Sequence, residues 1–325
     1  MLSTAVPPVV QLALTDAESE RAHRSILANL PPDGLDPDLE TVILGRIGAE
    51  ALIGALSPEA LAEVAGFPRS GSCLIVVRNL PQQERWPASP TSGWAAERDL
   101  SVVNALHLGM LQLMGIAPFA VGYENAGHLL RNVVPNPAAA GTTSSWGADQ
   151  EFFWHTDNPH LGFGAPGCDP RRYVPRFLTF CGIRNEEQVP TDVMPLPYAL
   201  EAMDEGLRED LGRAWFEVAA PDSVRAGEGG DRQALRSVPL LEPAGAEGGL
   251  PRIRFDRGTT TAAVPEAFDV LARFSDALES APYESLLLGA GDFLAFDNYR
   301  VLHRRVGFTP AGSGRERWLR RCYAG

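Results

Sequence analysis

The chain has 325 residues, of which 45% are hydrophobic and 21% are charged, as is ordinary for a soluble globular protein with one large or two average domains. Its formal net charge of -13 argues against nucleic-acid and anionic-membrane partners, because either would favour a basic surface. Four widely spaced cysteines without a CxxC pair predict free thiols, and no secretory or membrane-spanning pattern is present, so we expect a cytoplasmic protein.

The first part of the chain has a helical character. Thr15 and Glu18 form a capping-box pattern, which predicts the start of a helix. A compact run rich in valine at 72–78 follows a glycine-containing turn and predicts a buried strand. We therefore expect a mainly helical flanking region over 1–115. Its helical patterns cover about 15–30, 39–65 and 97–115.

From residue 116 onward, short apolar runs alternate with glycine, proline, asparagine and aspartate, which is typical of an all-β core. One helix is expected within this part at 265–278, with Pro265 in its first turn. A segment at about 221–249 is rich in glycine and charged residues, shows little periodicity and suits an exposed loop or lid. The clearest strand patterns lie at 150–155, 176–181, 250–256 and 291–297.

No linker or internal repeat divides the sequence. We therefore expect one domain over 1–325, in which the helical region 1–115 flanks a β-sandwich or barrel at 116–325. In such a fold a binding site can combine residues from strands that are distant in the sequence.

The most informative pattern is His155-Thr156-Asp157 with His303 far downstream. On a strand, residues i and i+2 project to the same face, so His155 and Asp157 can reach one metal ion while Thr156 points away. His303 follows a predicted strand and turn and is the best third ligand. Two histidines and one carboxylate form the facial triad of non-haem Fe(II) sites, which leaves positions open for a co-substrate and O2. His160 is expected to have a structural or supporting role.

Three motifs together resemble the clavaminate synthase-like, TauD-related Fe(II)/2-oxoglutarate oxygenases, and in particular the branch that hydroxylates free amino acids. They are FWHTD at 153–157, GDFLAFDNYRVLHR at 291–304 and RWLRR at 317–321. The resemblance covers about the C-terminal half and implies a mainly β fold, a double-stranded β-helix (jelly-roll) core with flanking α-helices. Many members of the branch carry glutamate as the acidic ligand, so Asp157 loosens the inference about the substrate. Halogenating relatives have a small residue there, and Asp157 argues against halogenation.

The resemblance also implies roles for residues outside the triad. Arg317 lies at the family's distance after His303, and its planar guanidinium suits the distal carboxylate of 2-oxoglutarate, with Thr191 beside it. Arg321 shares a strand face with Arg317 and would hold the carboxylate of an amino-acid substrate. Further substrate-binding residues are expected among Glu124, Asn125, Asp256, Asp222 and Ser145. The remaining arginines of this region are expected to form a solvated edge: Arg304, Arg305, Arg315 and Arg320.

The leading hypothesis is an Fe(II)- and O2-dependent 2-oxoglutarate dioxygenase that hydroxylates an unactivated C–H bond of a free L-amino acid, basic or polar, in specialised metabolism. One alternative keeps this chemistry, as hydroxylation or desaturation, on a carrier-tethered or other small carboxylate metabolite. Another is a zinc hydrolase that uses the same triad with one bound water, which leaves Arg317 without a role. A jelly-roll binding protein without activity is a third reading, and the intact triad argues against it.

Overall fold

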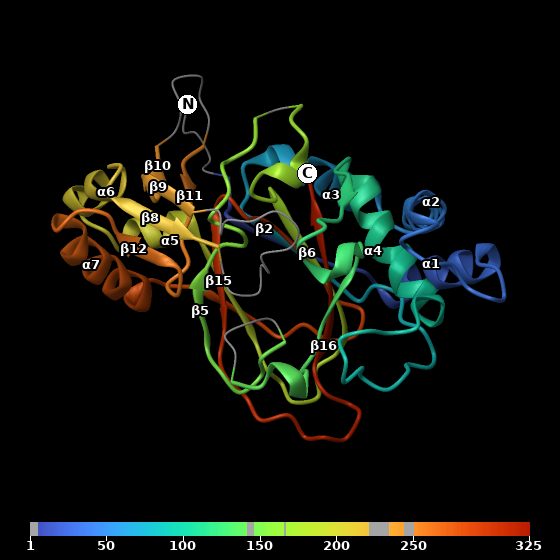
Figure 1. Ribbon diagram of the computed structural model, residues 1–325. Helices are drawn as coiled ribbons and strands as arrows, with labels where there is room; N and C mark the ends of the chain where they lie inside the picture. Colours follow the sequence, from blue (N-terminus) through green and yellow to red (C-terminus); the bar gives the residue numbers. More distant parts are fainter. Residues whose placement is uncertain (1–5, 142–145, 166, 221–233, 244–249) are drawn as a thin grey trace.

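The computed structural model describes residues 6–141, 146–165, 167–220, 234–243 and 250–325. Within them, two β-sheets face each other, and helices cover the outer face of each sheet (Figure 1). This is the jelly-roll core with flanking α-helices that the sequence motifs predict. None of the helices in these residues is long and apolar enough to cross a membrane.

The larger sheet has the strand order β1-β2-β14-β6-β16-β3, with β4 also paired to β16. The smaller sheet has the order β13-β7-β15-β5. The strands of the larger sheet are β1 (Val9–Ala13), β2 (Leu74–Arg78), β3 (Pro118–Phe119), β4 (Arg131–Val133), β6 (Phe177–Arg184), β14 (Phe293–Asp297) and β16 (Trp318–Ala324). Those of the smaller sheet are β5 (Phe152–His155), β7 (Thr191–Pro195), β13 (Glu284–Leu286) and β15 (Val301–Arg305).

Alternation along the central strands divides the apolar residues between two layers. In β14, Leu294 and Phe296 point into the core between the sheets, whereas Phe293 and Ala295 face the helices. Strands β2, β6 and β14 are buried on both faces along almost their whole length, which explains why their sequences are mostly hydrophobic without strict alternation. The strand predicted at 72–78 is confirmed as β2.

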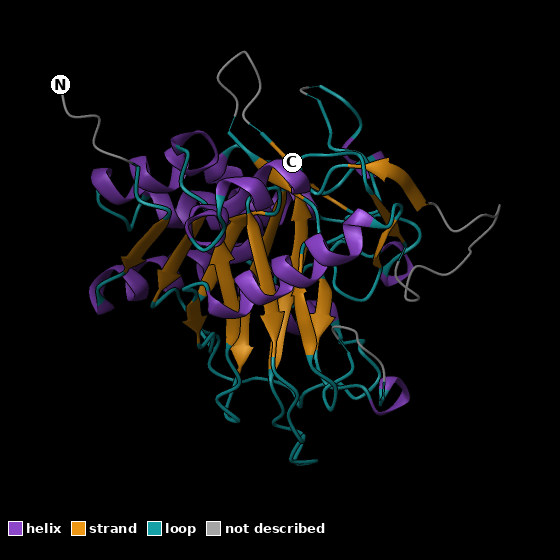
Figure 2. Cartoon of the chain, turned by 90° about the vertical axis from the view of Figure 1, so that its left-hand side faces the viewer, coloured by secondary structure: helices purple, strands orange, loops and turns teal. Residues whose placement is uncertain are grey.

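Helices α1 to α4 pack on the outer face of the larger sheet, with η1 (Glu97–Leu100) leading into α4. On the other side, α5 to α7 pack against a small sheet and the outer face of the smaller sheet; Figure 2 shows the strands behind this layer. The helices are α1 (Asp16–Asn29), α2 (Thr41–Ile53), α3 (Pro58–Ser70), α4 (Ser101–Met114), α5 (Leu196–Glu201), α6 (Glu205–Leu211) and α7 (Glu266–Ser280). The short strands are β8 (Phe216–Ala219), β9 (Ala234–Val238), β10 (Leu241–Glu242), β11 (Arg252–Ile253) and β12 (Thr260–Ala262).

The capping box at the first helix is confirmed: Thr15 Oγ1 accepts from the Glu18 backbone N–H at 3.3 Å, and Glu18 Oε2 accepts from the Thr15 N–H at 2.7 Å. The helical region predicted at 39–65 is two helices instead of one. Ser57 caps a new helix that begins at Pro58, and both residues favour a helix start over continuation.

Part of the loop predicted at 221–249 is wrong. Residues 234–242 lie inside the predicted loop at 221–249, yet they form β9 and β10, which pair with β8 and β11. Leu240 in the intervening turn is fully buried in the α5 to α7 layer, and this burial holds the segment in place. The rest of the predicted lid, 221–233 and 244–249, lies outside the described residues. The helix predicted at 265–278 is confirmed as α7, and Pro265 is its N-cap residue with helical backbone angles.

Candidate metal centre

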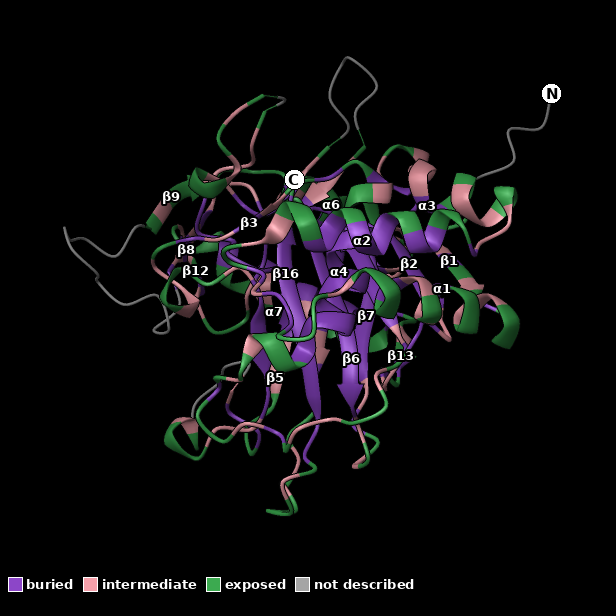
Figure 3. Ribbon diagram, turned by 90° about the vertical axis from the view of Figure 1, so that its right-hand side faces the viewer, coloured by how far each residue is buried: buried purple, intermediate pink, exposed green. Residues whose placement is uncertain are grey.

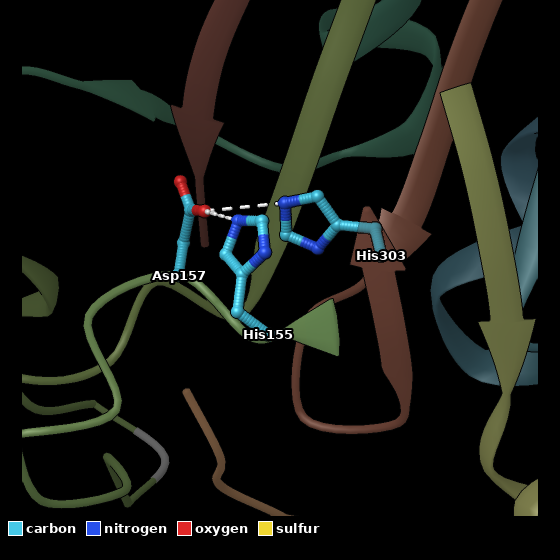
Figure 4. Close-up of side chains that lie close together, drawn as sticks. All are labelled: His155, Asp157 and His303. Atoms are coloured by element: carbon cyan, nitrogen blue, oxygen red, sulfur yellow. Dashed lines mark ion pairs between the residues drawn. The ribbon is translucent and has the colours of Figure 1, made fainter. Parts of the chain in front are cut away.

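Three buried side chains converge between the two sheets (Figure 4). His155 ends β5 and is the register partner of His303 in β15, which brings the imidazole centroids to 4.0 Å. Asp157 Oδ1 lies 3.3 Å from His303 Nε2 and 3.6 Å from His155 Nε2. The ligand atoms of the three residues all lie within 4.8 Å of one another, which is the spacing of donors that share one metal ion.

One nitrogen of the His155 ring is oriented to bind a metal ion. Its Nδ1–H donates to the Phe153 carbonyl at 2.7 Å, which leaves the Nε2 lone pair directed at the other members of the triad. That Nε2 is buried, and no side chain or backbone group of the described residues hydrogen-bonds to it. Burial, followed by the charge of His303, lowers the pKa of His155 to about 3, so the imidazole is neutral as a metal ligand must be.

Asp157 lies just beyond the end of β5, so it is not part of the strand on which the sequence places it. The strand ends because the Thr156 N–H turns to the Phe255 carbonyl, at 2.7 Å, and leaves the β5 ladder. The Asp157 backbone is held instead by Asn298, whose Oδ1 accepts from the Asp157 N–H at 2.9 Å and whose Nδ2 donates to the Asp157 carbonyl at 3.0 Å. These two hydrogen bonds fix the Asp157 backbone beyond the end of the strand.

The second carboxylate oxygen of Asp157 faces a hydrogen-bond donor pair. Arg321 Nη1 donates to Oδ2 at 3.0 Å, and the Tyr323 hydroxyl lies 3.0 Å from the same oxygen. Burial alone would raise the pKa of Asp157, but the Arg321 guanidinium and the two histidines outweigh it and hold that pKa below its usual range. Asp157 is therefore ionised, with Oδ1 turned to the histidines and Oδ2 turned to Arg321.

Glu124 joins this cluster from the loop before η2 (Asn125–Gly127). It accepts from Arg131 at 2.9 Å, pairs with Arg321, and lies 2.7 Å from the Tyr323 hydroxyl. The predicted substrate residues Glu124 and Arg321 are thus direct partners, and both line one pocket with Arg131 and Tyr323. Sequence reasoning missed Arg131 and Tyr323, although the i+2 spacing of Tyr323 from Arg321 is the signal that could have found the latter.

The other predicted substrate residues have different surroundings. Asn125 donates through Nδ2 to the backbone carbonyls of the His128 to Leu130 turn, at 2.9 and 3.2 Å. Asp256 forms a backbone bridge with His155, accepts from the Gly258 N–H at 2.7 Å, and burial raises its pKa. Asp222 and Ser145 lie outside the described residues.

The predicted co-substrate pair consists of Arg317, which directly precedes β16, and Thr191, which begins β7. Arg317 Nη2 donates to Thr191 Oγ1 at 2.7 Å, and Arg317 Nε donates to the Val189 carbonyl at 3.3 Å. The guanidinium is buried, and it borders a cavity that Arg305 and Trp146 also line. Within the described residues no carboxylate pairs with it, since Glu187 accepts only from the Arg317 backbone N–H, at 2.7 Å.

The predicted solvated arginine edge is wrong for three of its four members. Arg320 is fully buried on the helical side of β16, where it binds Glu97 and donates to Asn104 Oδ1 at 3.0 Å. Arg305 is buried and donates to the backbone carbonyls of residues 147 and 148. Arg304 is mostly covered and donates to Asp192 at 3.1 Å. Only Arg315 of the four is exposed, and it pairs with Glu186.

His160 is buried and does not belong to the triad cluster. Two imidazoles and one carboxylate therefore lie on one side of a buried space. This donor set suits Fe(II) and leaves the opposite side of the ion open. Zinc could bind the same donors, but a zinc hydrolase would leave the buried Arg317 guanidinium, which pairs with no carboxylate of the described residues, without a role.

Comparisons with known proteins agree with this chemistry. A family model described as the taurine catabolism dioxygenase TauD, TfdA family matches residues 108–323. The chain is similar to clavaminate synthase 2 of Streptomyces clavuligerus, with 26% identity over 319 residues that cover 95% of this chain and 91% of that protein. It is similar to an L-lysine 4-hydroxylase of Niastella koreensis, with 22% identity over 97% of this chain and 84% of that protein. A solved structure of asparagine oxygenase, in complex with Fe(II), 2S,3S-3-hydroxyasparagine and succinate, superposes with a TM-score of 0.79 at 21% identity and covers 96% of this chain and 92% of the other.

Proposed function

Because the chain belongs to the TauD, TfdA family, we propose that it is an Fe(II)/2-oxoglutarate-dependent dioxygenase that hydroxylates an unactivated C–H bond of a free L-amino acid. The observation that carries the proposal is the buried His155, Asp157 and His303 cluster beside the Glu124–Arg321 ion pair. Relatives named as an L-lysine 4-hydroxylase and an L-asparagine oxygenase match most of the chain, and their names support this substrate class. We propose one oxygenase domain over 1–325.

In this proposal His155, Asp157 and His303 hold Fe(II). The ion, when bound, supplies the activation of O2 that is coupled to the decarboxylation of 2-oxoglutarate. Burial, followed by the charge of Arg305, lowers the pKa of Arg317 to about 9, so Arg317 is still a cation at neutral pH. It offers the distal carboxylate of 2-oxoglutarate a charge-assisted pair, and Thr191 adds a hydroxyl. The surrounding apolar residues exclude water from the reacting atoms.

The Glu124–Arg321 pair suits the head group of an amino acid. An α-ammonium can replace Arg321 as a partner of Glu124, while the α-carboxylate takes the guanidinium donors that Glu124 releases. Asp157 Oδ2 keeps its own bond to Arg321, so the substrate head would be tied to the metal ligand through one guanidinium. We propose that Asn125, Asp256, Asp222 and Ser145 contribute to the rest of the substrate pocket, and that small carboxylates of other kinds are the alternative substrates.

A panel of proteinogenic L-amino acids, each incubated with Fe(II), ascorbate, 2-oxoglutarate and O2, tests the proposal. We expect a product one oxygen atom heavier than one of the amino acids, together with stoichiometric succinate. Succinate formed without a modified amino acid would indicate that the substrate is a carrier-tethered or other carboxylate metabolite. Turnover with zinc alone, independent of 2-oxoglutarate, would show that the protein is a hydrolase and contradict the oxygenase proposal.

A further inference from the structure

The outward face of α2 carries apolar side chains in open solvent. Val42 is 82% exposed, Ile53 is 55% exposed, and Leu39 just before the helix is 79% exposed; Ile43 is exposed as well. The other side of α2 packs on α4, so the helix belongs to the outermost layer (Figure 3). Single exposed aliphatic residues are ordinary, but several along one face of one helix mark an interaction surface.

Two opposite charges lie between the apolar ends of this face. Arg46 and Glu50 are both exposed, and within the described part of the chain neither forms an ion pair. The order is arginine first and glutamate four residues later, which is the less favourable order for a pair within one helix. The two side chains are therefore available to charges on another surface.

The spacing of these residues is symmetric about Gly48. Arg46 and Glu50 are equally far from it, as are Ile43 and Ile53, and as are Val42 and Gly54. Suppose that two copies of α2 pack antiparallel and cross at Gly48. Each residue of such a pair then lies opposite the other residue of that pair in the second copy. Arg46 then meets the partner's Glu50, Ile43 meets the partner's Ile53, and Val42 meets the space beside the partner's Gly54.

We infer that the outer face of α2 is a self-association surface, at which a second copy of this chain binds antiparallel about a two-fold axis near Gly48. An isologous contact needs a surface that is complementary to itself, and the charge pattern of α2 has this property. On its inner side α2 packs so closely on α4 that there is no room for a side chain at Gly48. A Cβ there would lie 1.8 Å from the Ala105 carbonyl oxygen. The helix therefore lies close against α4 and presents a fixed face.

The contact is small. One antiparallel helix crossing buries less than the roughly 1,600 Å² of a standard protein interface, which is the size range of weak or transient contacts. The association is expected to weaken as salt is raised, since the Arg46–Glu50 pairs lie at a solvent-accessible contact.

Charge-reversal variants of the full-length protein test the inference. Sedimentation velocity over a concentration series should show a monomer–dimer equilibrium. R46E and E50R should each raise the dissociation constant at least about tenfold, because each places like charges opposite one another twice per dimer. The double variant R46E/E50R restores both opposite-charge pairs and should return the constant to within about threefold of the wild-type value.

Arg236→Glu is the matched control, since Arg236 is exposed in β9 on the far side of the molecule from α2 (Figure 1). It should leave the equilibrium unchanged, and equal melting temperatures across the set should show that folding is intact. A protein that stays monomeric at the highest concentration would overturn the inference. So would a dimer that the single reversals do not weaken, or a double reversal that fails to restore it, because each result places the contact elsewhere.

Discussion

The side-chain amide of Asn298 holds the backbone of Asp157 from both sides, with its oxygen 2.9 Å from the Asp157 nitrogen and its nitrogen 3.0 Å from the Asp157 carbonyl oxygen. Asn298 is fully buried and lies in the turn between β14 and β15, shortly before His303. One amide thus connects the two segments that supply the triad. The relative position of Asp157 and His303 depends on this side chain as well as on sheet register.

Replacing Asn298 by alanine should therefore lower metal affinity. We expect the dissociation constant for Fe(II), or for Co(II) followed by its absorption spectrum, to rise by roughly 10- to 100-fold, as is common for residues that orient a ligand. Val64→Ala is a control for lost stability, because Val64 is fully buried in α3 among the N-terminal helices. If both variants lose stability but bind metal as the wild type does, Asn298 has a purely structural role.

Replacing Arg317 by leucine should raise the KM for 2-oxoglutarate by about 100-fold, because a buried charge-assisted pair to the carboxylate is lost. The KM for the amino-acid substrate should change little. Arg315→Leu serves as the matched control, since Arg315 lies two residues away but is exposed and paired with Glu186. An unchanged KM for 2-oxoglutarate in the Arg317 variant would place the co-substrate elsewhere.

Replacing Glu124 by glutamine should raise the KM for the amino acid by at least about tenfold and leave that for 2-oxoglutarate unchanged. The variant removes the anion for the substrate ammonium and leaves Arg131 and Arg321 with one carboxylate fewer between them. The unbalanced positive charge should lower the melting temperature of the single variant. Adding Arg131→Gln removes one of the two cations, so the double variant should regain the melting temperature of the wild type but keep the raised KM for the amino acid. Recovery of both would show that Glu124 only balances charge.

Acid should destabilise the metal-free protein well above the pH at which carboxylates titrate. Burial lowers the pKa of His107 to about 3 from its ordinary 6.5, so between these values the unfolded chain binds a proton that the folded chain does not. Stability is complete above pH 6.5 and falls as pH falls, by roughly 2 kcal/mol from this residue by pH 5. Urea unfolding at pH 7 and 5 should show a smaller decrease for His107→Gln. An equal decrease would assign the effect to other groups.

The proximity of His155, Asp157 and His303 could be predicted from the sequence because their residue types and the order of the motifs indicate a shared metal site. The role of Asn298, which holds Asp157 beyond the end of β5, could not. The surroundings of the arginines could not. Alternation places Arg320 opposite Arg321 across the sheet, but nothing in the local sequence shows that η1 and α4 cover that face and supply Glu97 and Asn104. The local sequence therefore predicts a solvated edge of arginines, whereas tertiary packing buries most of them.

Short strands at sheet margins were missed for a related reason. β1 pairs in parallel with β2, and β9 pairs with β8 across a long intervening segment. Their backbone partners are distant in sequence, and their side chains are only partly buried, so little periodicity marks them. The glycine-rich composition around β9 indicated a loop, whereas the burial of neighbouring Leu240 decides the conformation.

The alternation of β16 restricts how this chain can change over evolution. Leu319, Arg321 and Tyr323 face the interior between the sheets, while Trp318, Arg320 and Cys322 face the helices. A substitution on one face leaves the other intact, but inserting or deleting one residue would turn the Arg321 and Tyr323 side chains toward α4 and bring Arg320 to the acidic ligand. Among sequences that keep this site we expect variation in residue type along β16 and a fixed number of residues between Arg317 and Tyr323.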